Sequence, residues 1–146
     1  MKRRGLQLSR RHRRALGVAG GLLLVTGAAW AWVDHLDATA QASDMLRDLK
    51  PWLLKVHGFS AMTFVFLLGT LLPGHMRRGW HMRKNHQNGA FFLAAVSLLT
   101  LSGYLLYYLG DEHWRNATSE FHLWLGLVVP VLLVWHIRSG RKATRN

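Results

Sequence analysis

Three of the nine histidines in this 146-residue chain, His57, His122 and His136, fall inside or at the rim of long apolar stretches. An ionisable side chain at that depth in an apolar helix is costly, usually faces the interior of a helix bundle and marks a functional site. Neutral imidazole is also the commonest metal ligand among protein side chains. The chain contains no cysteine, which excludes a disulfide framework, thiolate-ligated zinc, iron–sulfur clusters and covalent haem attachment through C-x-x-C-H. The chemistry of the chain is therefore sought in its histidines.

The spacing of these histidines fits helices that carry two rings on one face. His122 and His136 are 14 residues apart, which is nearly four helical turns and a rise of about 21 Å. His57 and His75 are 18 residues apart, and five whole turns would bring both to one face if the helix stayed regular. Pro73 and Gly74 stand just before His75 and threaten that regularity.

The elements that must position these rings are four apolar runs. A bilayer core about 30 Å thick needs roughly 20 apolar residues in a helix, and the runs cover residues 15–33, 52–72, 89–109 and 121–137. A soluble domain of this length could not bury four such runs. The sequence therefore predicts one all-α, integral membrane four-helix bundle over residues 15–138, between a basic arm (1–14) and a basic tail (139–146).

The formal charge of +12 is a signal of orientation. Fifteen of the nineteen Lys and Arg residues lie in the arm, the middle loop and the C-terminal end from Arg138 onward, where no acidic residue occurs. All seven Asp and Glu residues lie in the other two connections. By the positive-inside rule, both termini and the middle loop are expected to be cytoplasmic. We therefore predict a multi-pass membrane protein, with membrane lipid and no nucleic acid among its partners.

This topology places the histidines in two facing pairs. His57 and His122 enter their helices from the outer surface, whereas His75 and His136 lie at the inner edge. A haem iron held from both sides needs two neutral imidazoles from different helices. The pairs therefore predict two haem b groups, with irons about 20 Å apart along the membrane normal. Such an arrangement would carry electrons across a bilayer.

Glycines and basic residues accompany both predicted sites. Gly58, Gly103 and Gly126 are small residues beside the outer pair, where a porphyrin could slide between helices. Glycine is also frequent in membrane helices for close packing alone, and surface Arg and Lys follow the positive-inside rule without any ligand. The candidates for the haem propionates are Lys55 and Arg115 at the outer site and Arg77, Arg78 and Arg138 at the inner site.

Two short motifs and one spacing carry a family resemblance. Residues 55–59 (KVHGF) open the second apolar run, residues 101–104 (LSGY) lie in the third, and His122, Gly126 and His136 follow in the fourth. In these features the chain resembles the bacterial b-type cytochromes of the cytochrome b561 superfamily. That group includes the four-helix membrane subunits of formate dehydrogenase and nickel-iron hydrogenase. The 14-residue spacing of the last two histidines is the most specific feature.

The resemblance covers roughly residues 50 to 138 and implies a set of haem ligands. It pairs His57 with His122 at an outer haem b and assigns His136 to an inner one. The inner partner differs among relatives, some of which use the start of the first helix and others the end of the second. The candidates here, in order of preference, are His75, His12, His86 and His81. His75 ends an apolar run, whereas His12 is surrounded by arginines.

Three functions are compared with these features. The first is a di-haem electron carrier of a respiratory chain, which passes electrons between quinone, or a cytoplasmic donor, and a redox partner protein. The second is a haem-free membrane anchor or assembly subunit of a larger complex. The third is divalent-metal transport, against which the absence of acidic residues from the four runs argues. We expect the first, with any enzymatic activity belonging to an oxidoreductase that uses this chain as its membrane subunit.

Overall fold

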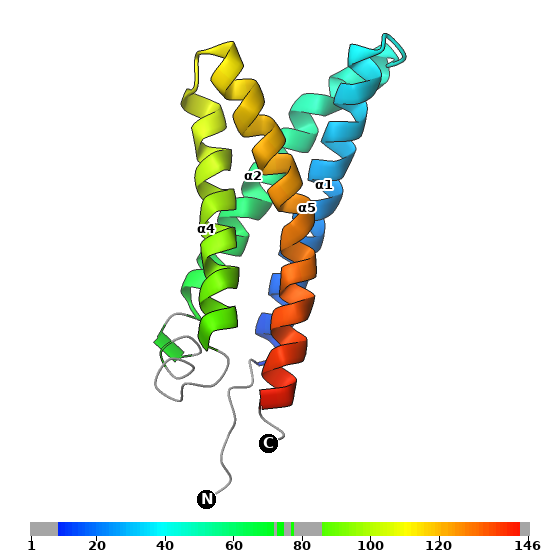
Figure 1. Cartoon of the computed structure of the whole chain (residues 1–146). Coiled ribbons are helices and arrows are strands. Elements are labelled where there is room, and N and C mark those ends of the chain that lie inside the picture. Colours follow the sequence, from blue (N-terminus) through cyan, green and yellow to red (C-terminus); the bar gives the residue numbers. More distant parts are fainter. Residues whose placement is uncertain (1–8, 72, 75–76, 78–85, 144–146) are drawn as a thin grey trace, which may run out of the picture. The chain divides into compact units, whose positions relative to one another are not determined.

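The computed structural model describes residues 9–71, 73–74, 77 and 86–143, without the side chains of His86, Arg141 and Ala143. Within these residues the chain forms four long α-helices and no β-strand (Figure 1); the helices are α1 (Arg10–Ala38), α2 (Asp44–Gly69), α4 (His86–Tyr108) and α5 (Glu112–Ala143). Each of the four is long and apolar enough to cross a membrane. The predicted all-α class is confirmed, and the helices are compatible with a multi-pass membrane protein.

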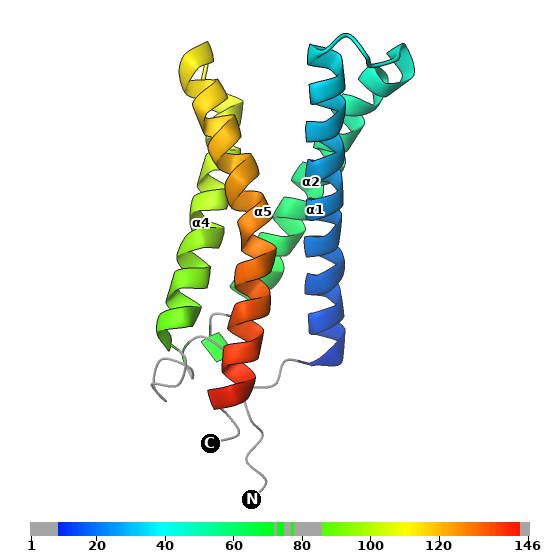
Figure 2. The same ribbon diagram turned by 45° about the vertical axis from the view of Figure 1, so that its right-hand side comes forward.

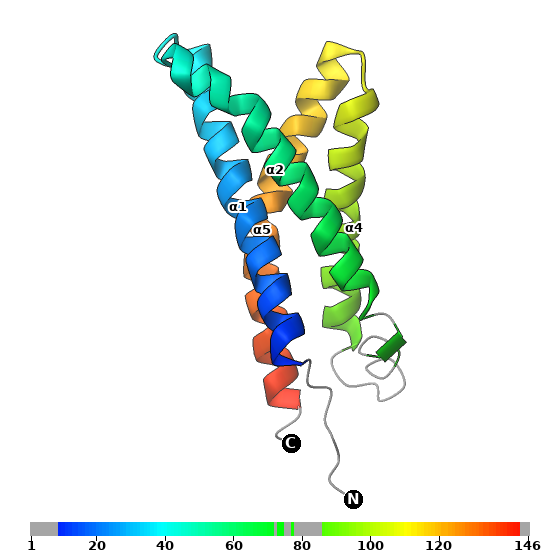
Figure 3. The same ribbon diagram turned by 180° about the vertical axis from the view of Figure 1, so that it is seen from behind.

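The chain divides into two compact units, residues 1–75 and residues 76–146. In the first unit α1 packs on α2, and in the second α4 packs on α5. Figure 3 shows α1 and α2 running antiparallel, and Figure 2 shows the same for α4 and α5. Each unit is thus one helical hairpin, and the histidines are described within their own hairpin.

The first helix starts earlier than its apolar run. The run begins at Ala15, but α1 begins at Arg10, because Ser9 caps it. The Ser9 hydroxyl accepts a hydrogen bond from the backbone N–H of His12 at 3.2 Å, which satisfies one of the donors that a helix leaves open at its start. His12 consequently belongs to the first turn of α1.

The last helix is also longer than its apolar run. A carboxylate oxygen of Asp111 accepts a hydrogen bond from the backbone N–H of Trp114 at 3.0 Å, and α5 begins at Glu112. The run predicted the segment from Phe121 onward, because hydropathy does not register a capped polar turn. The helix continues to Ala143, so part of the predicted tail is helical.

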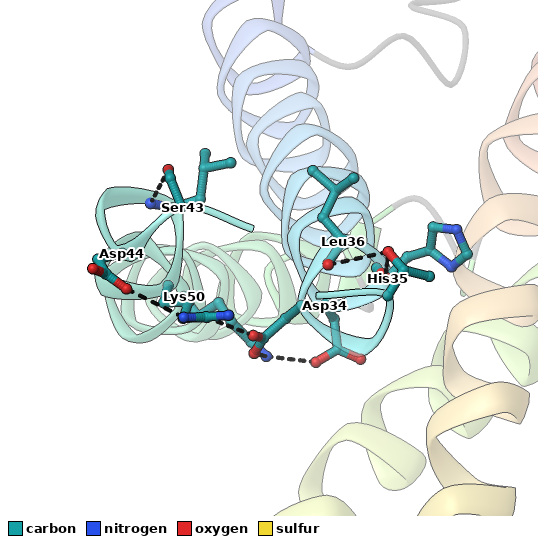
Figure 4. Close-up of polar contacts among 10 residues, drawn as sticks. Asp34, His35, Leu36, Ser43, Asp44 and Lys50 are labelled. Carbon is teal, nitrogen blue, oxygen red and sulfur yellow. Dashed lines mark hydrogen bonds and ion pairs between the residues drawn. The ribbon is translucent and has the colours of Figure 1, made fainter. Parts of the chain in front are cut away.

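An ion-pair network closes the turn between α1 and α2 (Figure 4). The Lys50 ammonium lies 2.6 Å from a carboxylate oxygen of Asp34 and 3.2 Å from one of Asp37. Arg47 reaches the other oxygen of Asp37 at 2.7 Å. Exposed ion pairs contribute little to stability one by one, but this network joins the end of α1 to the start of α2 and fixes their relative register.

Small residues form the contact between α1 and α2. The buried residues of α1 are Ala19, Thr26 and Val33, and a spacing of seven residues places them on one stripe of the helix. On α2 the buried residue is Ser60. Small side chains at a helix contact let two backbones approach closely, as is typical of helix pairs in membranes.

The contact between α4 and α5 is buried chiefly on the α4 side. Phe92, Ala95, Val96 and Ser102 are at most 8% exposed. Within α5, Pro130 has no N–H to donate to the carbonyl one turn earlier. The apolar stripe of α4 therefore provides the surface on which the histidine-bearing helix α5 rests.

The outward faces of the helices are strongly apolar. On α2, Phe59, Met62 and Phe66 are 74%, 76% and 73% exposed. Water-exposed apolar surfaces of this kind are unusual in soluble proteins and mark contact with a membrane or a partner. The exposed apolar faces agree with the hydropathy of the four helices.

Candidate functional site

The His57 ring lies against α1, within the first hairpin. Its Nδ1 is 3.1 Å from the hydroxyl oxygen of Thr26. The next residue, Gly27, leaves room for the ring, because the position that a Cβ would take there lies 3.1 Å from Cε1 and 3.4 Å from Nδ1 of His57. A hydroxyl–glycine pair on α1 therefore holds one edge of a half-buried imidazole.

The second hairpin repeats this arrangement around His122. Its Nδ1 is 2.9 Å from the hydroxyl oxygen of Ser102 on α4. The position that a Cβ would take at Gly103 lies 2.9 Å from Cε1 of the His122 ring. In both hairpins the first helix supplies the hydroxyl and the glycine, and the second supplies the histidine.

His136 packs on α4 through a glycine and an aromatic ring. The position that a Cβ would take at Gly89 lies 3.5 Å from Cε1 of His136. The rings of Phe92 and His136 are stacked, with centroids 5.6 Å apart and planes inclined by 14°. The half-buried His136 ring is thus held at the α4–α5 contact. The His122 ring is held at the same contact, nearer the start of α5.

His12 faces α2, although the arginines around it favoured a surface position. Its Nε2 lies 3.2 Å from the carbonyl oxygen of Leu67 and 3.4 Å from the hydroxyl oxygen of Thr70. The Ser9 cap places His12 in the first turn of α1.

Each hairpin therefore carries two imidazoles at two levels. On α5 the two rings come from His122 and His136, 14 residues apart, and on α4 the glycines that face them, Gly103 and Gly89, are also 14 residues apart. On α1, His12 precedes Thr26, the partner of His57, by 14 residues. This spacing corresponds to about 21 Å along a helix.

Other predicted site residues fall partly outside the described segments. His75, His81 and Arg78 lie outside the described residues, and of His86 only the backbone, at the start of α4, is described. Because α2 ends at Gly69, the regular helix that would have put His57 and His75 on one face does not extend that far. The role of His75 stays a prediction.

The two remaining predicted glycines lie in different settings. Gly58 is half-buried beside His57. The position that a Cβ would take at Gly126 lies 3.7 Å from Leu99, which is ordinary van der Waals contact. Gly126 is therefore compatible with close helix packing alone, whereas Gly27 and Gly103 meet an imidazole.

The basic residues predicted at the propionates are accessible. The side chains of Lys55, Arg77, Arg115 and Arg138 are exposed. The Lys55 ammonium also lies 4.4 Å from the centroid of the Trp52 ring, a distance suited to a cation–π contact. Each of the four can meet an anionic group, and their pairing with propionates stays a prediction.

Sequence reasoning missed Thr26, Gly27 and Gly89. A signal for them exists, because a hydroxyl residue followed by glycine occurs at residues 26–27 and again at 102–103. Gly89 also precedes Gly103 by 14 residues, the separation of His122 and His136.

Comparison of the chain with protein-family models, with curated proteins and with solved structures found no match.

Proposed function

We propose that the protein is a membrane-bound b-type cytochrome that moves electrons across a bilayer between two bis-His haems. The observation that carries this proposal is the matched pair of imidazole levels in each hairpin. Two hairpins with two rings each supply the four nitrogen ligands that two six-coordinate haems need. The outer haem takes His57 and His122, and the inner haem takes His136 and one further histidine.

Within each hairpin, the surroundings of one imidazole are compatible with this cofactor. Gly27 and Gly103 lack the Cβ that would meet the ring, so each imidazole can lie against the backbone of the neighbouring helix. Imidazole nitrogens of His57 and His122 would be the groups that hold a b-type haem. The rings of His57 and His122 are held within their own hairpins, which is the preorganisation that a ligand pair requires.

When bound, haem b supplies a reversible one-electron iron couple. The imidazoles would hold it, and the apolar helices would keep water and ions away from it. The exposed Lys55 and Arg115 offer positive charge to carboxylates at the outer level, as Arg77, Arg78 and Arg138 do at the inner one. These groups tune and orient the cofactor but carry out no covalent chemistry.

The inner partner of His136 is one of His75, His12, His86 and His81, and His12 and His75 have the stronger support. Spacing on α1 supports His12, because it precedes Thr26, the contact of His57, by 14 residues, and His122 and His136 are also 14 residues apart. Its Nε2 now contacts the Leu67 carbonyl, so the His12 ring would turn about its side-chain bonds to become a ligand. The position of His75 after an apolar run still supports the alternative.

The partners follow from the charge pattern. The basic arm, loop and tail support a cytoplasmic location of both termini in a bacterial inner membrane. Electrons would pass between quinone, or a cytoplasmic donor, and a redox protein on the outer face. The chain would then serve as the membrane subunit of an oxidoreductase, and the partner would supply any substrate specificity.

Haem content of the full chain tests the proposal. The full chain is expressed with adequate haem and purified in mild detergent. It should then show a b-type reduced-minus-oxidised spectrum and two haems per polypeptide. His57→Ala and His122→Ala should each leave one haem, and the double variant should also leave one, because both ligate the same iron. His57→Ala combined with His136→Ala should leave none. The exposed His35 provides the control, since His35→Ala should retain both haems.

The same logic identifies the inner ligand. Variants at His12, His75 and His86 are made singly and in combination with His136→Ala. The true partner is the one whose single loss removes one haem and whose loss removes no further haem when His136 is also replaced. Purified wild-type chain without any haem would overturn the proposed function. Loss of both haems in the His57/His122 double variant would overturn the assigned pairing.

A haem-free membrane anchor is the second candidate. The exposed apolar stripe of Phe59, Met62 and Phe66 favours it, because such a face could dock a partner helix as readily as lipid. Under this function the purified chain would carry no haem, and histidine variants would alter only its stability and its recovery with partner proteins.

A further inference from the structure

The two hydroxyl–glycine pairs have a chemical consequence for the histidines that face them. Thr26 is 6% exposed and Ser102 is 4% exposed, so neither hydroxyl is accessible to solvent. A buried hydroxyl has one hydrogen to donate and two lone pairs to accept with. Which of these it offers to the ring decides where the ring proton resides.

In both cases a backbone carbonyl takes the hydroxyl hydrogen. The Thr26 hydroxyl donates to the carbonyl of Leu22 at 2.6 Å, and the Ser102 hydroxyl donates to the carbonyl of Leu99 at 2.9 Å. Such back-bonding is usual for Ser and Thr in helices. With its hydrogen committed, each hydroxyl can meet the ring only as an acceptor.

The ring nitrogen that faces each hydroxyl is Nδ1, so Nδ1 must carry the proton. The distances are 3.1 Å between Thr26 and His57 and 2.9 Å between Ser102 and His122. In a neutral ring with Nδ1–H, the lone pair resides on Nε2.

We infer that Thr26 and Ser102 are positioning residues that hold His57 and His122 in the Nδ1–H tautomer, so that each ring presents Nε2 as its ligand atom. The inference rests on the proposed haem function for its purpose. A histidine ligand commonly has its tautomer fixed by a hydrogen bond at the other ring nitrogen, and that bond raises its basicity as a ligand. Here the same device occurs twice, in the same order along the chain.

The glycines complete the device. The Cβ position at Gly103 lies 2.9 Å from Cε1, 3.5 Å from Nδ1 and 3.8 Å from Nε2 of His122. At Gly27 the ring atoms within 4 Å are Cε1 and Nδ1 of His57. The Nδ1–Cε1 edge of each ring therefore lies on the neighbouring helix, and Nε2 is the ring nitrogen farther from it.

The tautomers can be measured in the full chain purified without haem. Chain labelled with ¹⁵N at histidine is studied by NMR at about pH 8, where an ordinary imidazole is neutral. The ¹⁵N shifts of the two ring nitrogens distinguish N–H from a bare nitrogen, and His57→Ala and His122→Ala assign the signals. We expect a protonated Nδ1 in both His57 and His122 of the wild-type chain.

Hydroxyl variants then test the cause. Thr26→Val keeps the side-chain shape and should shift His57 towards the Nε2–H form without affecting His122, whereas Thr26→Ser should restore Nδ1–H. Ser102→Ala should have the reciprocal effect on His122. Thr100 back-bonds to Val96 at 2.9 Å on the same helix as Ser102, so Thr100→Val is the matched control and should change neither ring.

In chain loaded with haem, Thr26→Val and Ser102→Ala should raise the midpoint potential of the outer haem, because a less basic ligand stabilises ferric iron less. The inference would be overturned if His57 and His122 carried the proton on Nε2 in the wild-type chain. It would also be overturned if the ¹⁵N spectra of the Thr26 and Ser102 variants matched those of the wild type. If the tautomers are not as expected but the chain binds two haems, only the tautomer assignment is refuted. A chain that shows the expected tautomers but binds no haem refutes the proposed function and the ligand role with it.

Discussion

Replacing Gly103 by alanine should displace the His122 ring and remove the outer haem. The new Cβ would stand 2.9 Å from Cε1 of the ring, whereas carbon atoms in favourable contact are about 3.5–4.0 Å apart. The ring must therefore retreat by roughly 0.6 Å or more. Its hydrogen bond to Ser102, now 2.9 Å, would stretch to the limit of a useful bond.

The stability of the hairpin should change far less than its ligand geometry. Alanine is favoured over glycine in a helix interior by about 0.8–1 kcal/mol. Overpacking at a tight contact costs about 1–3 kcal/mol. The two effects at Gly103 oppose each other, and a net loss of about 0–2 kcal/mol is expected. Haem content is therefore the sensitive measurement.

The assay is the haem-to-protein ratio of purified Gly103→Ala together with its thermal melting in detergent. We expect one haem per chain and a melting temperature close to that of the wild type. Gly126→Ala is the matched control, because its Cβ would meet Leu99 at an ordinary 3.7 Å, and it should retain both haems. If Gly103→Ala retains two haems with an unchanged spectrum, the close approach of backbone and ring is irrelevant to binding and the reasoning fails.

Three further predictions concern other contacts. Gly27→Ala should also leave one haem, because its Cβ would lie 3.1 Å from a ring carbon, whereas Gly21→Ala has open space and should keep two haems and melt slightly higher. Phe92→Ala removes the ring that stacks on His136, and it should destabilise the hairpin by about 3–5 kcal/mol in thermal unfolding and broaden the spectrum of the inner haem. Lys50→Met breaks the network at the first turn and should lower the melting temperature slightly at low salt and negligibly at high salt.

The helices could be predicted from the sequence because lipid-compatible runs are long and unmistakable. Their ends could not, because Ser9 and Asp111 extend the helices through polar residues by capping. A capped turn adds hydrogen bonds without adding hydropathy. The apolar runs therefore located the four helices but underestimated α1 and α5.

The candidate site was predictable where it depends on spacing along one helix. The interval between His122 and His136 places both rings on one face of α5, as expected. The roles of Thr26 and Ser102 were not predictable, because they depend on which residue of a neighbouring helix stands opposite each ring. The contact of His12 with Leu67 and Thr70 was not predictable for the same reason.

The hairpin organisation also bears on how the chain is made. The contacts that orient His57 include Thr26 and Gly27, and both precede His57 in the order of synthesis. A ribosome therefore delivers the residues that cradle this ring before the ring itself. The second hairpin repeats that order, with Ser102 and Gly103 synthesised ahead of His122. Each imidazole thus emerges to meet a partner helix that is already complete.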